Sequence, residues 1–248
     1  MNVNKDIFTV LDSGIPTFME ANFPLEWSMT RNEKFCFIKL LEILKPEVAI
    51  EIGVDQGGSL QVMSKYAEKV YAIEIDKSKV ERLQGKFNNV EFLVGDSKTI
   101  IPKLLDTIQK DGKSLEFALI DGDHSEKGVK ADIENLIKYI PPKSLNIILH
   151  DSFNPDCRKG MTSVNYTTNK HVHYVELDYI SGTFEPDGQR NEMWGGLGHI
   201  VLLNEERTKH LDVNQSQERL FNITKRYSKH NWELTDKILN KLKYILKK

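Results

Sequence analysis

Five short apolar runs recur in the first 150 residues, and most are followed by a segment with helical spacing. The runs cover residues 48–53, 70–75, 90–95, 115–120 and 145–150. Apolar runs of this length, bounded by turn residues, are typical of strands covered on both faces. Neighbouring parallel strands need crossover connections, which helices supply. The alternation therefore predicts an α/β fold, with a mostly parallel sheet that carries helices on both faces.

The segments around these runs predict helices near 58–68, 77–86 and 97–110. A further helix follows the fourth run and ends before Pro141. Ahead of the first run, Thr30 and Glu33 form a capping box, which indicates a helix that ends before Pro46. The helices and strands thus alternate from about residue 30 to residue 150.

After Asp151 the pattern changes. A loop and a helix are expected over 152–170, followed by strands at 171–180 and 198–203 with no crossover helix between them. We therefore expect an antiparallel strand at the edge of a doubly wound, Rossmann-like, seven-stranded sheet. The expected organisation is an N-terminal helical cap (1–45), a central domain (46–203) and a C-terminal helical extension (204–248).

Composition limits the possible partners and surroundings. The 248 residues carry a formal net charge of −2 with a pI near 6.4, which favours neither nucleic acid nor an acidic membrane surface. The two cysteines, Cys36 and Cys157, are too few for a disulfide framework, so we expect a reducing compartment. No signal peptide and no apolar run long enough to span a membrane are evident. We therefore expect a cytoplasmic protein.

The residues at the carboxyl end of each strand are the strongest candidates for a ligand site, because doubly wound sheets bind ligands beyond these ends. Glu51, Gly53, Gly57, Gly58 and Ser59 follow or end the first strand. Glycines let backbone amides approach a ligand closely, and a helix start offers unpaired N–H groups. The spacing differs from the GxGxxG of a nicotinamide-binding turn. The turn therefore predicts a ligand with a carboxylate or a phosphate.

The next two strands end in acids. Glu74 lies 21 residues after Gly53, where a carboxylate can accept hydrogen bonds from ribose hydroxyls. Asp96 follows the third strand and could receive an adenine amino group, or it could simply cap the next helix. Glu51 has two possible roles as well, because it could orient the turn or contact the ligand.

The fourth and fifth strands end in a cluster of titratable residues. Asp121 and His124 follow the fourth strand, and His150 and Asp151 end the fifth. A charge at the end of a buried strand needs a partner, a metal or a chemical role. Asp121 could alternatively cap the helix that starts near Ser125.

The sequence resembles the class I methyltransferases that depend on S-adenosylmethionine (AdoMet), from about residue 46 to residue 203. EIGVDQGGS is similar to the AdoMet-binding turn of the divalent-metal-dependent O-methyltransferases such as the catechol type, and YAIEID to their ribose-binding strand end. DGDHSEKGVKADIE followed by IILHDS resembles the branch of macrocin O-methyltransferase and cephalosporin hydroxylase-like proteins. The resemblance implies that Ser59 binds the methionine carboxylate of AdoMet and that Glu74 binds its ribose. The cofactor-binding residues expected together are Glu51, Gly53, Gly57, Ser59, Glu74, Asp96 and Asp121.

The resemblance also implies a divalent metal, Mg or Mn, on Asp121 and Asp151, with His124 as general base. One departure concerns His150, because the catechol type has Asp-Asn here and the macrolide-sugar branch has Glu-Asp. Alternation along the strand could point His150 away from Asp151. If His150 does coordinate, the site suits Mn, Fe or Zn better than Mg.

The function expected from the resemblance is metal-assisted O-methylation of a hydroxyl on a saccharide, either a glycan or a sugar-containing natural product. The alternative is an AdoMet-binding accessory protein of a glycan pathway that transfers no methyl group. A nicotinamide oxidoreductase is disfavoured because GxGxxG is absent. The expected partners are a small-molecule or glycan acceptor and no nucleic acid.

Three further features have two interpretations each. His171 and His173 share a strand face, as zinc ligands could, but no third ligand has a diagnostic spacing, which favours an edge strand. Trp194, with Gly195 and Gly196, could line the acceptor pocket, or it could anchor the core at the end of a hairpin. Residues 221–248 carry eight Lys or Arg against two acids, which indicates a solvated helix face or an anionic surface contact.

Overall fold

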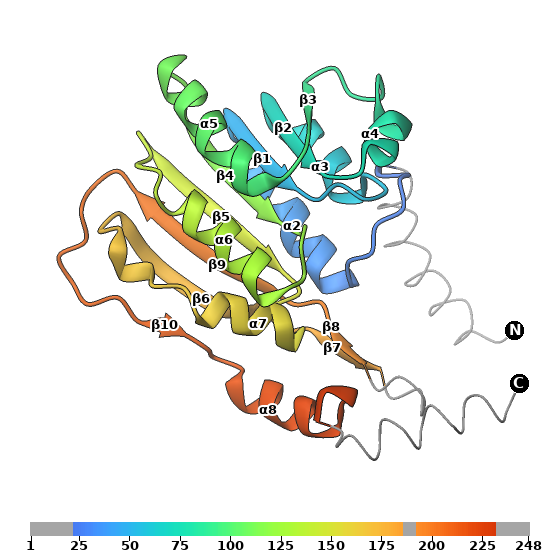
Figure 1. Ribbon diagram of the computed structural model, residues 1–248, viewed down its shortest axis with the longest axis vertical. Helices are drawn as coiled ribbons and strands as arrows, with labels where there is room; N and C mark the ends of the chain where they lie inside the picture. Colours follow the sequence, from blue (N-terminus) through green and yellow to red (C-terminus); the bar gives the residue numbers. More distant parts are fainter. Residues whose placement is uncertain (1–21, 186–191, 232–248) are drawn as a thin grey trace, which may run out of the picture.

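The computed structural model describes residues 22–185 and 192–231, and its main element is a sheet of order β10-β6-β9-β5-β4-β1-β2-β3 (Figure 1). Its strands are β1 (Val48–Ile52), β2 (Lys69–Glu74), β3 (Val90–Val94), β4 (Leu115–Ile120), β5 (Ser144–His150), β6 (Val172–Ile180), β9 (Leu197–Leu203) and β10 (Val213–Asn214). The seven expected strands are all present. The eighth, β10, has only two residues and therefore gives no periodic signal in the sequence.

The direction of the strands confirms the expected fold class. β9 runs antiparallel to both β5 and β6, whereas the other neighbouring pairs in this sheet are parallel. The antiparallel strand thus lies between β5 and β6 rather than at the outermost edge. The strand order reverses between β1 and β4, so the switch point of the sheet lies between their carboxyl ends.

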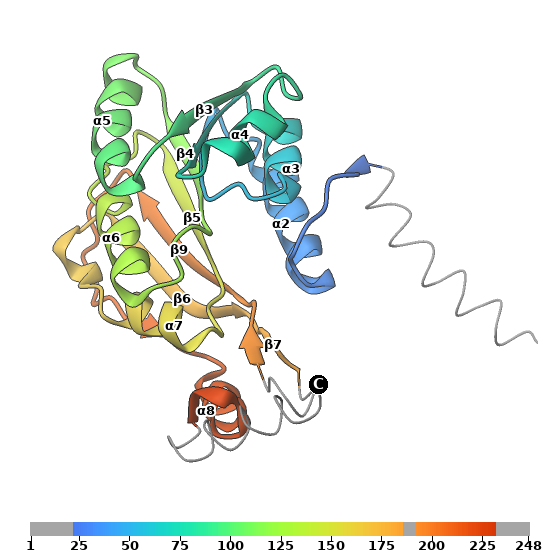
Figure 2. The same cartoon turned by 45° about the vertical axis from the view of Figure 1, so that its right-hand side comes forward.

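Helices cover both faces of the sheet. They are α2 (Arg31–Leu44), α3 (Gly58–Tyr66), α4 (Lys77–Leu83), α5 (Ser97–Lys110), α6 (Glu126–Leu136), α7 (Pro155–Thr162) and α8 (Glu218–Tyr227). Figure 2 shows α2, α3 and α4 on one face and α5, α6 and α7 on the other. None of the described helices is long and apolar enough to cross a membrane.

The hydrophobic core has one large cluster on each face of the sheet. In β1, Val48 and Ile50 pack with α5 and α6, whereas Ala49 packs with α2 and α3, because successive strand residues point to opposite faces. Phe37 and Leu41 of α2 are fully buried in the second cluster. Each such side chain contributes roughly 1.5–3 kcal/mol to stability. α2 thus belongs to the core, and the boundaries at 45 and 203 remain predictions.

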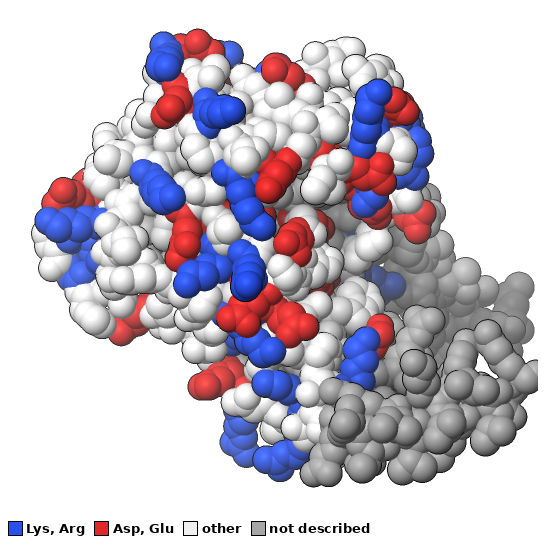
Figure 3. All heavy atoms as spheres, in the orientation of Figure 1, with Lys and Arg blue, Asp and Glu red and all other residues white. Residues whose placement is uncertain are grey.

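A smaller apolar cluster attaches the end of the described chain. Phe153, Met193 and Phe221 join α8 to the hairpin of β7 (Thr183–Glu185) and β8 (Glu192–Trp194). The sequence also predicts a C-terminal helix with an apolar face of Leu234, Ile238, Leu242 and Ile245. These residues, and most of the basic residues of 221–248, lie outside the described residues. Figure 3 shows Lys and Arg side chains interspersed with Asp and Glu over the described part of one face, as expected for a net charge near zero.

Candidate active site

The switch point of the sheet is closed by a backbone contact that only glycine permits. Gly53 follows β1 with a φ of 83°, and a Cβ atom there would overlap the backbone carbonyl oxygen of Asp121. Two adjoining cavities open beside this contact, and Gly53 and Asp121 line both. We call them the β2–β3 cavity and the β4–β5 cavity, after the strands whose ends they adjoin.

The β2–β3 cavity has a volume of about 380 Å³ and is lined by Glu74 and Asp96. The Glu74 carboxylate is nearly buried and accepts hydrogen bonds from the backbone N–H groups of Val54 (3.1 Å) and Asp76 (3.0 Å). Asp96 caps α5 by accepting a hydrogen bond from the backbone N–H of Lys98 (3.0 Å). The cap proposed for Asp96 is thus present, and its adenine contact remains a prediction.

A buried acid at the end of β1, Glu51, supports the turn between β1 and α3. Glu51 is fully buried, and the Ser59 hydroxyl donates a hydrogen bond to its Oε1. Burial raises the pKa of Glu51 well above its ordinary value. Gly57, with a φ of 84°, occupies the N-cap of α3. Ser59 lines the β4–β5 cavity, whereas Glu51 and Gly57 line neither cavity, which agrees with a role of Glu51 in orienting the turn.

The β4–β5 cavity is larger, at about 570 Å³, and holds the titratable cluster. Its lining includes Trp27, Met29, Ser59, Asp121, His124, His150, Asp151 and Trp194. The side chains therefore come from the approach to α2, the start of α3, the ends of β4 and β5, and the end of β8. Trp194 lies in the cavity lining, as one of its two interpretations requires.

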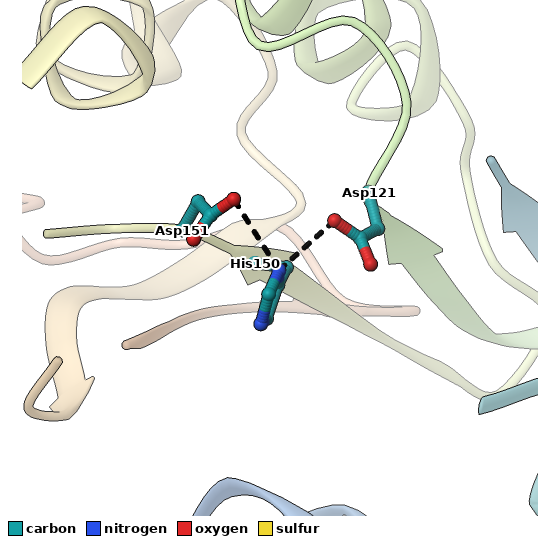
Figure 4. A group of neighbouring side chains, drawn as sticks. All are labelled: Asp121, His150 and Asp151. Carbon is teal, nitrogen blue, oxygen red and sulfur yellow. Dashed lines mark hydrogen bonds and ion pairs between the residues drawn. The ribbon is translucent and has the colours of Figure 1, made fainter. Parts of the chain in front are cut away.

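Asp121, His150 and Asp151 converge at the carboxyl edge of the sheet (Figure 4). His150 Nδ1 lies 2.9 Å from Asp121 Oδ1 and 3.6 Å from Asp151 Oδ2. One ligand atom from each residue lies within 4.8 Å of the others. The strand ends at His150, and Asp151 has a φ of 57°. The alternation of a strand therefore does not continue through Asp151, and both side chains face Asp121.

The conformation of Asp151 is held by the turn between β8 and β9. Asp151 Oδ1 accepts a hydrogen bond of 2.5 Å from the backbone N–H of Gly195, and the backbone N–H of Phe153 donates to the Gly195 carbonyl (2.9 Å). Gly195 and Gly196 have φ angles of 70° and 84°, which a residue with a side chain rarely adopts. The sequence placed these two glycines beside Trp194 in the acceptor-pocket interpretation, but it did not predict their hydrogen bonds to Asp151 and Glu33.

The carboxylates shift the pKa values of both histidines. Burial alone would lower the pKa of His150, but the charges of Asp121 and Asp151 raise it to about 10. Burial likewise favours the neutral form of Asp121, but the charge of His150 lowers its pKa to about 2. His124 Nε2 lies 3.5 Å from Asp121 and 3.4 Å from Asp151, and hydrogen bonding to Asp121 raises its pKa. His124 is half exposed, so it lies on the open side of the cluster.

The donor set of this cluster fits a divalent metal. It offers two carboxylate oxygens and an imidazole nitrogen, a combination that suits Mn, Fe or Zn. The His150 ring is oriented with Nδ1 toward the two aspartates, whereas the buried Nε2 has no hydrogen-bond partner among the described residues and lies 3.6 Å from Glu33 Oε1. Metal binding would displace the imidazole proton. Asp121, His150 and Asp151 are the residues that would hold the ion.

His171 and His173 do not join a comparable cluster within the described ranges 22–185 and 192–231. The His171 ring contacts the backbone carbonyl of Leu203 (2.9 Å), and the His173 ring that of Glu205 (2.8 Å). These contacts agree with the edge-strand interpretation.

The glycine turn at the switch point, the acid at the end of β2 and the acidic edge at β4 and β5 lie where a class I AdoMet-dependent methyltransferase would need them. Residues 50–152 match the profile of a family described as a methyltransferase domain, which confirms the resemblance drawn from the motifs. The chain thus carries an AdoMet-dependent methyltransferase domain.

Curated relatives agree with this class. A probable ribosomal RNA small subunit methyltransferase A of Pyrococcus furiosus is 42% identical over 65 residues, which cover 25% of this chain and 24% of the relative. An uncharacterized RNA methyltransferase of Clostridium tetani is 26% identical over 133 residues, covering 51% of this chain and 27% of the relative. The chain thus spans about a quarter of the length of these relatives.

Solved structures agree on the fold. Cofactor-bound Rv0187 from MTB has a TM-score of 0.54 at 17% identity, covering 81% of this chain and 97% of that protein. The O-methyltransferase TomG of Streptomyces achromogenes, in complex with SAM, has a TM-score of 0.52 at 14% identity, covering 75% of this chain and 86% of TomG. At these identities the likeness shows a shared fold.

Proposed function

We propose that this protein is a metal-assisted, AdoMet-dependent O-methyltransferase that acts on a hydroxyl of a saccharide, either a glycan or a sugar-containing natural product. The observation that carries the proposal is the convergence of Asp121, His150 and Asp151 next to the Gly53 turn. This arrangement would bring an acceptor oxygen close to a methyl donor, and methyl transfer depends mainly on such proximity and alignment.

The donor would extend from the β2–β3 cavity past Gly53 into the β4–β5 cavity. Glu74 is held by two backbone N–H groups, which fixes its carboxylate for the ribose hydroxyls. Asp96 and Gly95 line the same cavity near the expected adenine position. Ser59 lies on the far side of Gly53, at the start of α3, where the methionine carboxylate is expected. The contacts of these residues with AdoMet are part of the proposal.

When bound, a divalent cation lowers the pKa of the acceptor hydroxyl and AdoMet supplies an electrophilic methyl group. Asp121, His150 and Asp151 are the residues that would hold this cation beside the acceptor. His124 Nε2 accepts the hydroxyl proton as the new O–CH₃ bond forms and the S–CH₃ bond breaks. Its place 3.4–3.5 Å from both carboxylates stabilises the resulting imidazolium.

A saccharide fits the β4–β5 cavity because the lining combines aromatic faces with hydroxyl-binding groups. Trp27 and Trp194 offer apolar surfaces, and the carboxylates accept hydrogen bonds from hydroxyls. Among the described lining residues, Lys79 is the one Lys or Arg. The curated relatives include RNA methyltransferases by name, but a lining with a single such cation is poorly suited to a phosphate backbone.

We also propose a cytoplasmic location. Cys36 and Cys157 are both free thiols, and Cys157 is buried. Free thiols persist most readily in a reducing compartment such as the cytoplasm.

The test measures donor, metal and transfer separately. Isothermal titration with AdoMet and with NAD should show binding of AdoMet alone. A labelled methyl group from AdoMet should reach an acceptor in a panel of sugars, nucleotide sugars and glycosides, with activity lost in EDTA and restored by Mn²⁺. Transfer that survives EDTA would contradict metal assistance. Binding of AdoMet and Mn²⁺ with no transfer to the panel would favour the accessory-protein alternative.

A further inference from the structure

Glu33 makes a helix cap in an unusual environment. It is the third residue of α2, and its Oε2 accepts a hydrogen bond from the Thr30 backbone N–H (2.6 Å), while its own N–H faces Thr30 Oγ1 (3.4 Å). These two contacts make the capping box expected from the sequence. A charged side chain is rarely fully buried unless it is paired, yet Glu33 has no solvent exposure. The second carboxylate oxygen therefore needs an explanation beyond the cap.

That second oxygen, Oε1, faces the candidate metal cluster. It accepts a hydrogen bond from the Gly196 backbone N–H and lies 3.6 Å from His150 Nε2. Glu33 thus joins the start of α2, the turn between β8 and β9, and the end of β5. Within the described residues, Glu33 is the acid that lies beside His150 Nε2, whereas Asp121 and Asp151 lie beside Nδ1.

We propose that Glu33 is a positioning residue, which keeps the proton of His150 on Nε2 so that the Nδ1 lone pair is free to bind the metal. The inference rests on the proposed metal site. In Figure 4 the Nδ1 side of the ring points between the two aspartates, and the other ring nitrogen points away from them. A neutral imidazole that binds metal through Nδ1 carries its proton on Nε2. In this buried position that proton requires an acceptor, and a carboxylate behind a histidine ligand is a common way to supply one.

The three contacts of Glu33 all require an acceptor. The backbone N–H groups of Thr30 and Gly196 donate to the carboxylate, and the proposal adds an Nε2 proton of His150, 3.6 Å from Oε1. Glutamine has nearly the same volume but only one acceptor oxygen, so its NH₂ group must face one of these donors. If its oxygen stays toward Gly196 and His150, glutamine keeps an acceptor there but loses the negative charge that holds the Nε2 proton. If its NH₂ group takes that place, it meets the Gly196 N–H and favours the ring proton on Nδ1, where the metal should bind. Glu33→Gln therefore tests the acceptor with little change in packing.

The experiment uses the full chain and Mn²⁺ alone, without AdoMet or acceptor. Mn²⁺ affinity is measured by electron paramagnetic resonance for the wild type, Glu33→Gln and Thr30→Ala. We expect Glu33→Gln to weaken Mn²⁺ binding 10- to 100-fold, the usual range for residues behind a metal ligand. Thr30→Ala is the matched control, since it damages the same capping box but leaves the carboxylate. It should lower the midpoint of urea unfolding and change Mn²⁺ affinity less than about twofold.

Two further measurements separate positioning from a general structural role. In a His150→Ala background, Glu33→Gln should have no further effect on Mn²⁺ affinity, because its partner is gone. Nitrogen-15 NMR of the Zn²⁺-loaded wild type should show the His150 proton on Nε2, and this test does not depend on the folding of any variant.

The outcomes distinguish this inference from the proposed function. If the wild type binds Mn²⁺ and Glu33→Gln binds it equally well, or the loss persists without His150, the role of Glu33 is refuted and the metal site stands. A His150 proton found on Nδ1 refutes it as well. If the wild type binds no Mn²⁺, the proposed metal site fails, and this inference fails with it.

Discussion

The two cavities beside Gly53 are assembled in different ways. In the β2–β3 cavity the Glu74 carboxylate contacts Val54, which is 20 positions away, within consecutive strand-turn-helix units. In the β4–β5 cavity, Asp151 contacts Gly195, 44 positions away, and Glu33 contacts Gly196, 163 positions away. The β2–β3 cavity, the proposed donor side, is thus a property of local motifs. The β4–β5 cavity, the proposed metal side, is formed only when segments far apart in the sequence meet.

Their electrostatics differ as well. On the donor side, a single nearly buried acid, Glu74, is stabilised by backbone N–H groups. On the proposed metal side, Glu33, Asp121 and Asp151 lie 2.9–3.6 Å from the His150 ring, and their charges raise the pKa of that imidazole. Removing one partner from such a buried cluster leaves another charge uncompensated, which is costly. Substitutions on the proposed metal side should therefore strongly lower methyl transfer and leave AdoMet affinity nearly unchanged.

The largest effect is expected where the two sides meet. Gly53→Ala should lower the free energy of unfolding by roughly 2–5 kcal/mol, because its positive φ and its overlap with the Asp121 carbonyl both oppose a side chain. Urea unfolding measures this loss. Gly112→Ala is the control: its φ is 68° and nothing lies within 4 Å, so about 1–2 kcal/mol is expected. Equal losses in the two variants would show that the contact between the sides is unimportant.

Asp151→Asn should disable the metal side alone. The amide keeps an oxygen for the Gly195 N–H but loses the negative charge. Methyl transfer and Mn²⁺ affinity should fall by more than about 100-fold, because loss of a ligand should exceed the loss typical of residues behind one. AdoMet affinity, measured by calorimetry, should change less than about twofold. A parallel fall in AdoMet affinity would mean that the two sides cannot be separated.

Glu74→Gln should give the opposite pattern. The amide offers one acceptor in place of two, so either the backbone N–H groups or the ribose loses a hydrogen bond to a charged group. We expect AdoMet affinity to fall about 10-fold, with Mn²⁺ affinity unchanged. Unchanged AdoMet binding would remove Glu74 from the donor site.

The smallest effect concerns Asp132 on α6, which accepts a hydrogen bond from the Ser97 hydroxyl next to the donor side (2.6 Å). Burial raises the pKa of Asp132 to about 6. Because this pKa exceeds the unfolded value, the folded state loses stability as pH rises from about 4 to above 6. Asp132→Asn should therefore stabilise the protein at pH 8 and change its stability little at pH 4. Urea unfolding at the two pH values measures the difference, and a stabilisation independent of pH would contradict the assignment.

Local patterns were sufficient for much of the fold. The apolar runs predicted β1 to β5 within about a residue, and the capping box of Thr30 and Glu33 predicted the start of α2. The position of β9 between β5 and β6 was not predicted, since strand order depends on contacts between distant segments. β10 was missed because two residues cannot show a period.

The site residues fall into the same two groups, those predicted from local patterns and those placed only by tertiary contacts. By itself, the sequence determined that Gly53, Glu74 and Asp121 lie at the carboxyl ends of strands, at one edge of the sheet. The apolar runs fix where each of these strands ends. Only the tertiary structure decided that His150 and Asp151 face the same candidate metal site and that Glu33 lies beside His150 Nε2. The reason is physical: a left-handed φ at Asp151 and a fully buried carboxylate on α2 are stable only once the turn at Gly195 and Gly196 supplies their hydrogen bonds.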